Sequence, residues 1–436
     1  MSETDGVTAG DLTEGDRVVL LLPSSEAYAH ATLAMLCAGI QPVPLDPALT
    51  AAELEPVLAD VRARMVVTDE DQLEALRALG PTDLTGALPR ARPMHLTSGT
   101  TGRRKAVDSG ILSRAHAAAL VREERDEWRF TPHDVHLIMS PLYHSAPLRF
   151  AHGTLLAGGR LVVPGSFDPA LMSRAIAEGG VTTTFCVPTH LQRLFAHWDH
   201  HGTPNLSGFR LLAHAGAPCP REVKQRLIDV FPQDTTWEFY GSTEGQFTSC
   251  SAQEWIEHPG TVGRARRGRR LFSDPDGTLW CVVPDHARFS YFGAPDKTAA
   301  TWRRTHDGWA FTVGDAGSVD ADGYVTLHGR RDDLIITGGV NVYPLEVESA
   351  LLEAPGVDDV AVYGRPDDTW GTRVCAAVVG TPDPEFLREF ARTRLSGPRR
   401  PKEYAFLSEL PRNPTGKVLR GAVAALVDAQ PANARR

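Results

Sequence analysis

The chain has 436 residues, of which 42% are hydrophobic and 23% charged, and its formal net charge is −9. This length predicts two or more domains, and the negative charge argues against a nucleic-acid-binding protein. The six cysteines form no CxxC pair, the polar N-terminus is unlike a signal peptide, and the longest apolar stretches are too short to span a bilayer. We therefore expect a cytoplasmic protein with no membrane span and no nucleic-acid partner.

The first 70 residues alternate between strand and helix patterns. Residues 17–23 form a continuous apolar run, as in a buried parallel strand, and residues 26–39 predict a helix that stops at a glycine. A second strand at 41–47 precedes a capping box, Thr50 with Glu53, which opens another helix. A third strand follows at 64–69. This β-α-β-α-β order predicts an α/β domain with a mainly parallel sheet flanked by helices.

The same alternation continues to about residue 245, and the pattern then changes twice. From about residue 261 the apolar runs are short and are joined by Asp-Gly turns at 276–277 and 322–323, which predicts β-hairpins. After residue 330 a small α+β pattern begins, with a helix opened by Pro344. We therefore predict a multi-subdomain N-terminal domain over 1–329, a hinge over 330–333 and a small mobile C-terminal domain over 334–436.

The segment MHLTSGTTGRRKAV, residues 94–107, has the composition of an anion-binding loop. Backbone amides of a glycine-rich turn can surround phosphate oxygens, hydroxyl groups add donors, and a lysine adds positive charge. The candidate ligands are Thr97, Ser98, Gly99, Thr100, Thr101, Gly102 and Lys105. The spacing differs from the GxxxxGK[ST] phosphate loop. Taken alone, the segment is also compatible with a surface turn.

The loop resembles the phosphate loop of the adenylate-forming superfamily, STSGTTGxPKG, and further motifs of that superfamily follow in the expected order. They are PLYHSAPL (141–148), AGAP (215–218), FYGSTEG (239–245), PGTVGR (259–264), VGDAG (313–317), GRRDDLIITGGVNVYPLEVE (329–348) and PRNPTGKVLR (411–420). The chain is most similar to acyl-CoA synthetases and other acid:CoA ligases. It differs in having Arg104-Lys105-Ala106 in place of PKG, and its short connection over 71–95 predicts a shortened N-terminal domain.

The resemblance implies a two-step, AMP-forming reaction. ATP and Mg²⁺ would activate a carboxylic acid as acyl-AMP with release of pyrophosphate, and CoA would then take the acyl group. The resemblance leaves the acceptor open, because a carrier-protein thiol, an amine, or activation of an unusual acid of the diazo-forming type would use the same first step. The shortened domain is compatible with a ligase of secondary metabolism, and with a homodimer that covers an exposed sheet edge.

The resemblance also assigns roles in nucleotide binding. Thr97 to Gly102 and Lys105 would hold phosphates, Glu244 would bind Mg²⁺, and Thr243 would contact the α-phosphate. The remaining expected nucleotide contacts are the adenine-side residues Gly216, Ala217, Pro218, Tyr240 and Gly241 and the ribose-side residues Asp315 and Arg330.

Three further roles follow from the C-terminal motifs. Lys417 would be catalytic, since a cation at the acyl oxygen and α-phosphate offsets charge that grows in the transition state. Asp332 would be the hinge residue about which the small domain turns between the two steps. Gly338 and Gly339 would let pantetheine pass close to the backbone.

The substrate pocket is expected around PLYHSAPL. Ser145 stands where relatives that activate amino acids carry an aspartate, which disfavours an α-amino acid, and His144 resembles the gate residue of CoA ligases. The other expected lining residues are Val187, His214, Ala215, Phe239 and Gln246. This mixture favours a fatty or aryl acid.

The run GRARRGRR, residues 263–270, contains five arginines. It could bind a CoA phosphate or a carrier protein, but we favour the interpretation that it is a solvated turn.

Overall fold

The computed structural model describes residues 6–97, 105–412 and 418–429. The chain divides into two compact units. The first comprises 1–215, 226–271 and 281–311, and the second 216–225, 272–280 and 312–436. The domain boundaries expected at residues 329 and 334 stay predictions. No helix in the described ranges is both long enough and apolar enough to cross a membrane.

The first unit begins with a three-stranded parallel sheet in the order β2-β1-β3, which confirms the predicted alternation. Its elements are η1 (Ala9–Asp11), β1 (Arg17–Leu20), α1 (Glu26–Cys37), β2 (Gln41–Pro44), α2 (Ala51–Val61), β3 (Met65–Val67) and α3 (Glu70–Arg77). The expected capping box of Thr50 and Glu53 opens α2. Val18, Leu20 and Tyr28 are fully buried and belong to one apolar core.

A seven-stranded sheet in the order β12-β11-β10-β9-β8-β6-β7 forms the larger part of the first unit. Strands β7, β6, β8, β9 and β10 run parallel, and β11 and β12 add antiparallel strands at one edge. The strands are β6 (Val135–Ile138), β7 (Arg160–Val162), β8 (Thr183–Cys186), β9 (Leu211–His214), β10 (Thr236–Glu238), β11 (Thr248–Ser251) and β12 (Arg264–Ala265).

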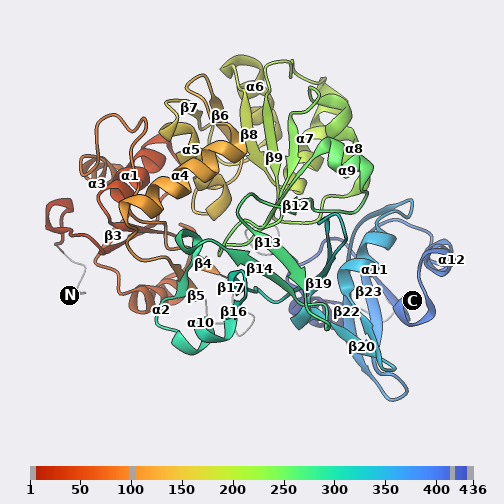
Figure 1. The fold of residues 1–436 in the computed structure, drawn as a ribbon. Coiled ribbons are helices and arrows are strands. Elements are labelled where there is room, and N and C mark those ends of the chain that lie inside the picture. Colours follow the sequence, from red (N-terminus) through yellow and green to blue (C-terminus); the bar gives the residue numbers. More distant parts are fainter. Residues whose placement is uncertain (1–5, 98–104, 413–417, 430–436) are drawn as a thin grey trace. The chain divides into compact units, whose positions relative to one another are not determined.

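The helices of this region are α4 (Arg114–Trp128), α5 (Ser145–Leu156), α6 (Pro169–Gly179), α7 (Pro188–His201), α8 (Arg221–Val230) and α9 (Ala252–Glu257). Helix α5 packs against β6, β7 and β8 on one side and against α1 and α4 on others. Figure 1 shows this arrangement, with α4 and α5 between the red N-terminal elements and the yellow-green sheet. Helix α5 therefore lies between the three-stranded parallel sheet with its helices and the seven-stranded sheet.

The predicted β-rich region consists of short antiparallel strands. One small sheet has the order β15-β5-β4, and β17 pairs with both β14 and β16. Its elements are β4 (Leu96–Thr97), β5 (Lys105–Asp108), β13 (Arg270–Ser273), β14 (Leu279–Val283), η2 (Asp285–Ala287), β15 (Ser290–Tyr291), α10 (Pro295–Thr301), β16 (Trp302–Thr305) and β17 (Gly308–Phe311).

The second unit contains the predicted α+β pattern. A three-stranded sheet β22-β23-β24 packs against α11 and α13, and two hairpins, β18-β19 and β20-β21, precede it. The elements are β18 (Asp315–Val319), β19 (Val325–Arg330), η3 (Arg331–Asp333), β20 (Ile335–Thr337), β21 (Val340–Val342), α11 (Pro344–Leu351), β22 (Val357–Asp367), β23 (Gly371–Gly380), α12 (Pro384–Arg394), η4 (Gly397–Arg399), β24 (Glu403–Leu407) and α13 (Arg420–Asp428).

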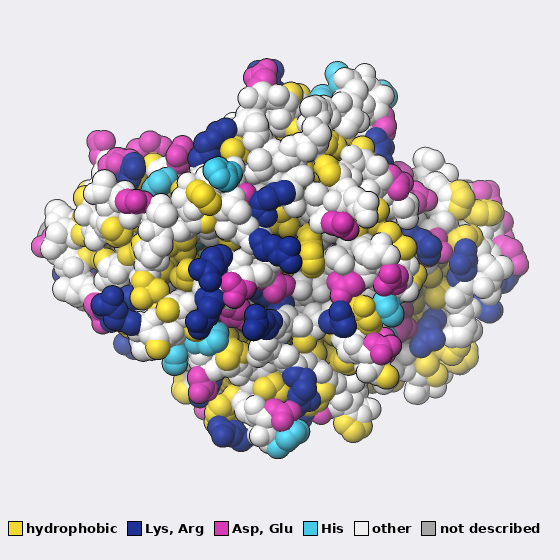
Figure 2. Space-filling model, turned by 45° about the horizontal axis from the view of Figure 1, so that its top comes forward, with side chains coloured by type: hydrophobic (Ala, Val, Ile, Leu, Met, Phe, Trp, Pro, Cys, Tyr) yellow, Lys and Arg dark blue, Asp and Glu magenta, His cyan; other side chains and the backbone are white. Residues whose placement is uncertain are grey.

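The surface carries mixed charge. On the face shown in Figure 2, Lys and Arg side chains alternate with Asp and Glu side chains, in keeping with a modest net charge of −9 on 436 residues.

Candidate active site

Lys105 and Glu244 are joined through Tyr291. Strand β5 begins at Lys105 and pairs antiparallel with β15, which places Tyr291 opposite Val107. The Tyr291 hydroxyl donates to Glu244 Oε1 at 2.7 Å, and the Lys105 ammonium lies 5.2 Å from the centre of the Tyr291 ring. An ammonium over an aromatic face is attracted by the ring quadrupole. The structure thus brings together two predicted phosphate and metal ligands that are far apart in sequence.

Glu244 is held in a tight loop that follows β10. The Glu244 amide donates to Ser242 Oγ at 3.3 Å, the Ser242 amide donates to the Gly245 carbonyl at 2.8 Å, and Gly241 forms an isolated bridge with Gln246. A Cβ on Gly241 would lie only 2.9 Å from the Gly245 carbonyl oxygen, so the loop can close this tightly only with glycine at that position.

The Glu244 carboxylate fits the predicted role as a Mg²⁺ ligand. Within the described ranges, no group of three or more His, Cys, Asp or Glu side chains gathers into a metal site. Mg²⁺ at nucleotide sites needs only one or two carboxylates, because substrate phosphates and water supply its other ligands. A buried single carboxylate beside a lysine meets that requirement, and a bound Mg²⁺ would neutralise phosphate charge there. Thr243 precedes Glu244 in the same loop.

The predicted ribose ligands Asp315 and Arg330 face each other in the second unit. They are register partners in the β18-β19 hairpin, and Arg330 Nε lies 3.4 Å from Asp315 Oδ1. Arg330 also donates to the Val313 carbonyl at 3.0 Å, which orients its guanidinium. Gly216, Ala217 and Pro218 belong to the second unit and Tyr240 to the first, so adenine contact by these residues stays a prediction.

The hinge and pantetheine candidates also lie in the second unit. Asp332 is in the short helix η3, and Gly338 and Gly339 form the β20-β21 turn with φ of +55° and +78°. A Cβ on Gly338 would approach the Trp370 ring to 2.8 Å. The turn therefore needs glycine, as a site of close backbone approach requires.

Six predicted ligands lie outside the described residues. They are Ser98, Gly99, Thr100, Thr101, Gly102 and Lys417. Thr97 is described and ends β4, opposite Lys105 on β5, so the two ends of the phosphate-loop candidate are adjacent.

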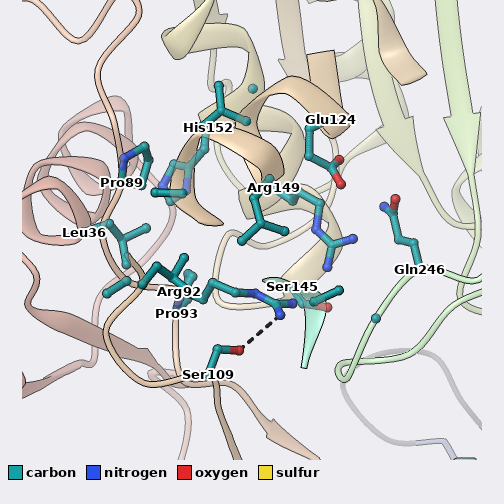
Figure 3. Close-up of a pocket in the computed structure, with 18 of the residues that line it drawn as sticks. Leu36, Pro89, Arg92, Pro93, Ser109, Glu124, Ser145, Arg149, His152 and Gln246 are labelled. Atoms are coloured by element: carbon teal, nitrogen blue, oxygen red, sulfur yellow. Dashed lines mark hydrogen bonds between the residues drawn. The ribbon is translucent and has the colours of Figure 1, made fainter. Parts of the chain in front are cut away.

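A cavity of about 180 Å³ lies beside the Glu244 loop in the first unit. Its walls come from the end of α1, the segment 89–95, helices α4 and α5, and the loop 243–246 (Figure 3). Four of the predicted site residues line it: Ser145, Thr243, Glu244 and Gln246. A small organic acid placed here would lie next to the candidate metal ligand.

His144 stands at the N-cap position of α5, one residue before Ser145. Its ring packs edge-on against Tyr143 with the centroids 4.4 Å apart, and its Nε2 is buried with no hydrogen-bond partner in the described parts of the chain. Burial lowers the pKa of His144 to about 4. The side chain is therefore neutral at physiological pH and can rotate without breaking an ion pair, as a gate residue requires.

The other expected pocket residues lie in a different place. Val187, Ala215 and Phe239 pack with Trp128 and Phe150 in an apolar cluster, and His214 is fully buried. None of these four predicted residues lines the 180 Å³ cavity. Their role in substrate binding stays a prediction.

The interpretation of GRARRGRR as a solvated turn is wrong for two of its arginines. Arg266 is only 2% exposed and pairs with Glu124 at 3.1 Å, while Arg269 pairs with Glu123. Both carboxylates lie on α4. Packing against this acidic helix turns these side chains inward, whereas Arg267 in the same run is exposed.

Several residues of the site were not predicted from the sequence. Tyr291 lies in no motif, and its contact with Glu244 spans 47 residues, so no local pattern indicates it. Arg149 did have a signal, because it follows Ser145 by four residues on α5 and therefore lies on the same helix face. Arg92 and Glu124 also line the cavity and were missed.

Comparison with known proteins agrees with these motifs. The model of the AMP-binding enzyme family matches residues 6–90 and 93–273, and the model of its C-terminal domain matches residues 346–417. The chain belongs to the AMP-binding enzyme family. The predicted adenylate-forming fold class, an α/β architecture with a small α+β part, is thereby confirmed, and so is the prediction that the chain is a ligase-type enzyme that uses ATP.

Individual members give the degree of similarity. The chain is 32% identical to a feruloyl-CoA synthase of Amycolatopsis sp. over 96% of the chain and 90% of that protein. It is 31% identical to the fatty acid–[acyl-carrier-protein] ligase ScoC of Streptomyces coeruleorubidus over 94% and 87%. The crystal structure of ATP-bound MatB from Rhodopseudomonas palustris superimposes with a TM-score of 0.80 at 29% identity, covering 96% and 90%.

Proposed function

We propose that this AMP-binding enzyme converts a carboxylic acid to its CoA thioester in two steps. In the first, a carboxylate oxygen attacks the α-phosphorus of ATP and pyrophosphate leaves. In the second, the CoA thiol attacks the acyl carbonyl, AMP leaves with the bonding electron pair, and the thiol proton is lost to solvent. The observation that carries the proposal is the Lys105–Tyr291–Glu244 assembly, which lies beside a cavity large enough for a small acid.

The first step needs alignment and charge neutralisation rather than a protein nucleophile. Lys105 and the Thr97 to Gly102 loop would bind the β- and γ-phosphates, Glu244 would hold Mg²⁺, and Thr243 would contact the α-phosphate. Lys417 would offset the charge that develops between acid and α-phosphate. Ser145 and Gln246 line the same cavity as Thr243 and Glu244, so an acid bound there would have its carboxylate near this loop.

Chemistry alone does not select the acceptor, because any thiol or amine can attack acyl-AMP. CoA is supported by the similarity to a feruloyl-CoA synthase. A carrier-protein thiol is the second candidate, and it is supported by the similarity to the ligase ScoC.

One experiment separates these acceptors. The protein would be incubated with ATP, Mg²⁺ and a panel of fatty, aryl and small polar acids, with and without CoA, and the products identified by mass spectrometry. We expect an acyl-CoA together with AMP and pyrophosphate. Accumulation of acyl-AMP that CoA does not consume would contradict the CoA assignment and favour a carrier protein or amine. No AMP from any acid would contradict the proposed activity.

Cytoplasmic location and a homodimer belong to the same proposal. A supply of ATP and CoA favours the cytoplasm. The outer strands of the β2-β1-β3 sheet each have a single neighbouring strand, and such an edge can pair with a second copy. Light scattering of the purified protein would give a mass of about twice 47.3 kDa if the homodimer forms.

A further inference from the structure

The 180 Å³ cavity contains more cationic than anionic side chains. Four arginines line it, Arg92, Arg125, Arg149 and Arg269, against two carboxylates, Glu124 on α4 and Glu244. Arg125 pairs with Asp126 at 3.3 Å. Figure 3 shows Arg149 and Arg92 extending between the Leu36–Pro89 side of the cavity and the Gln246 side. Such an excess of cations in a semi-enclosed site needs an explanation, since charged groups that lose water are normally paired.

The glutamates of α4 already have partners. Glu123 pairs with Arg269 and lies 3.2 Å from His286, Glu124 lies 3.1 Å from Arg266, and Glu127 lies 3.6 Å from the same arginine. These contacts neutralise Arg266 and Arg269. Each of these α4 glutamates is thus already paired with Arg266 or Arg269, and none is available to pair with Arg92 or Arg149 alone.

Arg149 and Arg92 are therefore the unbalanced cations. Within the described residues, Arg149 forms no ion pair or hydrogen bond, and Arg92 donates to a neutral acceptor, Ser109 Oγ, at 3.1 Å. Burial lowers the pKa of Arg92 to about 10 and also lowers that of Arg149. A guanidinium keeps its charge at neutral pH. Burial by itself would raise the pKa of Glu124, but Arg266, Arg149 and Arg92 lower it. One carboxylate thus serves three guanidinium groups.

A further donor faces the same space. Gln246 Oε1 accepts a hydrogen bond from Arg266, and this fixes the orientation of the amide. Gln246 Nε2 is then buried with no partner in the described parts of the chain, and Figure 3 shows the amide turned toward Glu124 and Arg149. Two guanidinium groups and one amide N–H form a donor set that suits an anionic, acceptor-rich group.

The rest of the cavity limits the size of its occupant. Leu112, Val121, Phe130 and Leu156 contribute apolar walls. An apolar cavity of about 150 Å³ is known to hold benzene, so about 180 Å³ accommodates one ring or a short chain.

We propose that the acid activated by this enzyme carries a second anionic group, a carboxylate or a sulfonate, on a single ring or short chain, and that Arg149 binds this group with support from Arg92 and Gln246. This rests on the proposed function and specifies its substrate class. One carboxylate lies at the Thr243–Glu244 end of the cavity, where it is adenylated, and the second anion pairs with Arg149. Binding of the anion completes the charge balance that the protein leaves open.

The test compares matched pairs of acids that differ only in the second group. The pairs are benzoate with isophthalate, butyrate with succinate, and propionate with 3-sulfopropionate, each assayed for acid-dependent pyrophosphate release. We expect kcat/KM to favour at least one two-anion acid over its partner by roughly 100-fold or more, since a site with fixed donors rejects an analogue that leaves them unpaired. The carboxylate and sulfonate pairs show which anion is accepted.

Variants then assign the preference to Arg149. Arg149→Gln should lower kcat/KM for the two-anion acid by about 100-fold, mainly through KM, and leave the single-anion acid unchanged or better. Arg149→Lys, which keeps the charge, should restore part of the activity. Arg114→Gln, an exposed arginine on α4, is the matched control and should behave as wild type. Thermal denaturation shows whether each variant is folded.

The outcomes are distinguishable. No AMP from any acid would overturn the proposed function, and this inference with it. Activation of single-anion acids with no preference for two-anion acids would overturn the inference alone. An Arg149→Gln variant that loses activity equally on both members of a pair would also overturn it, because that result indicates a structural role.

Discussion

The hydroxyl of Tyr291 donates a 2.7 Å hydrogen bond to Oε1 of Glu244, while the Tyr291 ring lies under the Lys105 ammonium. One side chain thus orients both the candidate metal ligand and the candidate phosphate ligand. Hydrogen bonds of this kind to a metal-binding carboxylate set its direction and basicity.

Tyr291→Phe is expected to lower the rate of acid-dependent pyrophosphate release by about 10- to 100-fold and to raise the Mg²⁺ concentration needed for half-maximal rate. Tyr291→Leu removes the ring as well and should in addition raise KM for ATP. The measurement is a Mg²⁺ titration of the initial rate for the wild type and both variants. A wild-type Mg²⁺ dependence in Tyr291→Phe would show that the hydroxyl does not position Glu244.

Gly241→Ala should distort the loop that carries Thr243 and Glu244, because the new Cβ would lie 2.9 Å from the Gly245 carbonyl oxygen and 3.0 Å from the Gln246 Cα. We expect a loss of adenylation of about tenfold or more, since small displacements of positioning groups are costly in rate. Gly245→Ala in the same loop is the steric control, because its Cβ would meet only Phe311 at 3.6 Å. Equal rates for the two variants would contradict the steric argument.

Lys417→Ala is expected to lower AMP formation by roughly 100- to 1000-fold, the range seen when one group that stabilises transition-state charge is removed. Conversion of chemically prepared acyl-AMP to the thioester should be affected far less, because that step does not require the same cation. Lys402→Ala, a surface lysine in the same unit, serves as the control. Unchanged AMP formation in Lys417→Ala would refute the assignment.

Arg266→Gln should lower the free energy of unfolding by about 3–5 kcal/mol, because it leaves Glu124 and Glu127 without their buried partner. Arg267→Gln, in the same run but exposed, should change stability by less than about 0.5 kcal/mol. Urea denaturation of the two variants and the wild type makes this comparison. Similar small losses in both would restore the solvated-turn interpretation that the structure contradicts.

Stability should fall as the pH drops below about 6.5. Burial lowers the pKa of His136 and His152 to about 3, so the folded state binds fewer protons than the unfolded state between pH 3 and 6.5. Their contribution is therefore fully present above pH 6.5 and is lost as the pH falls toward 3. From pH 6.5 to 5, each costs about 2 kcal/mol.

Urea denaturation at pH 5 and pH 7 measures this slope. His136→Gln removes one titrating ring and should lose less stability between the two pH values than the wild type does, whatever its absolute stability. An unchanged difference between pH 5 and 7 would mean that His136 does not contribute to the slope.

The sequence alone determined the family, the fold class and most of the reaction. The capping box of Thr50 and Glu53 and the apolar run of β1 are local signals, so helices and parallel strands could be placed from them. The motifs around Lys105, Glu244 and Asp315 are contiguous, and each is readable without knowledge of its neighbours. Asp315 and Arg330, assigned to one role, are indeed register partners.

Only the tertiary structure decided how the site is assembled. Tyr291 lies beside the strand of Lys105 because β15 pairs with β5. Arg92 and Arg149 line one cavity although they come from the segment before β4 and from α5. Such contacts join residues that are tens of positions apart, so no local or periodic pattern in the sequence indicates them. The net charge of the cavity depends on side chains from several elements. Likewise, which arginines of GRARRGRR are buried depends on the glutamates of α4, which pair with Arg266 and Arg269.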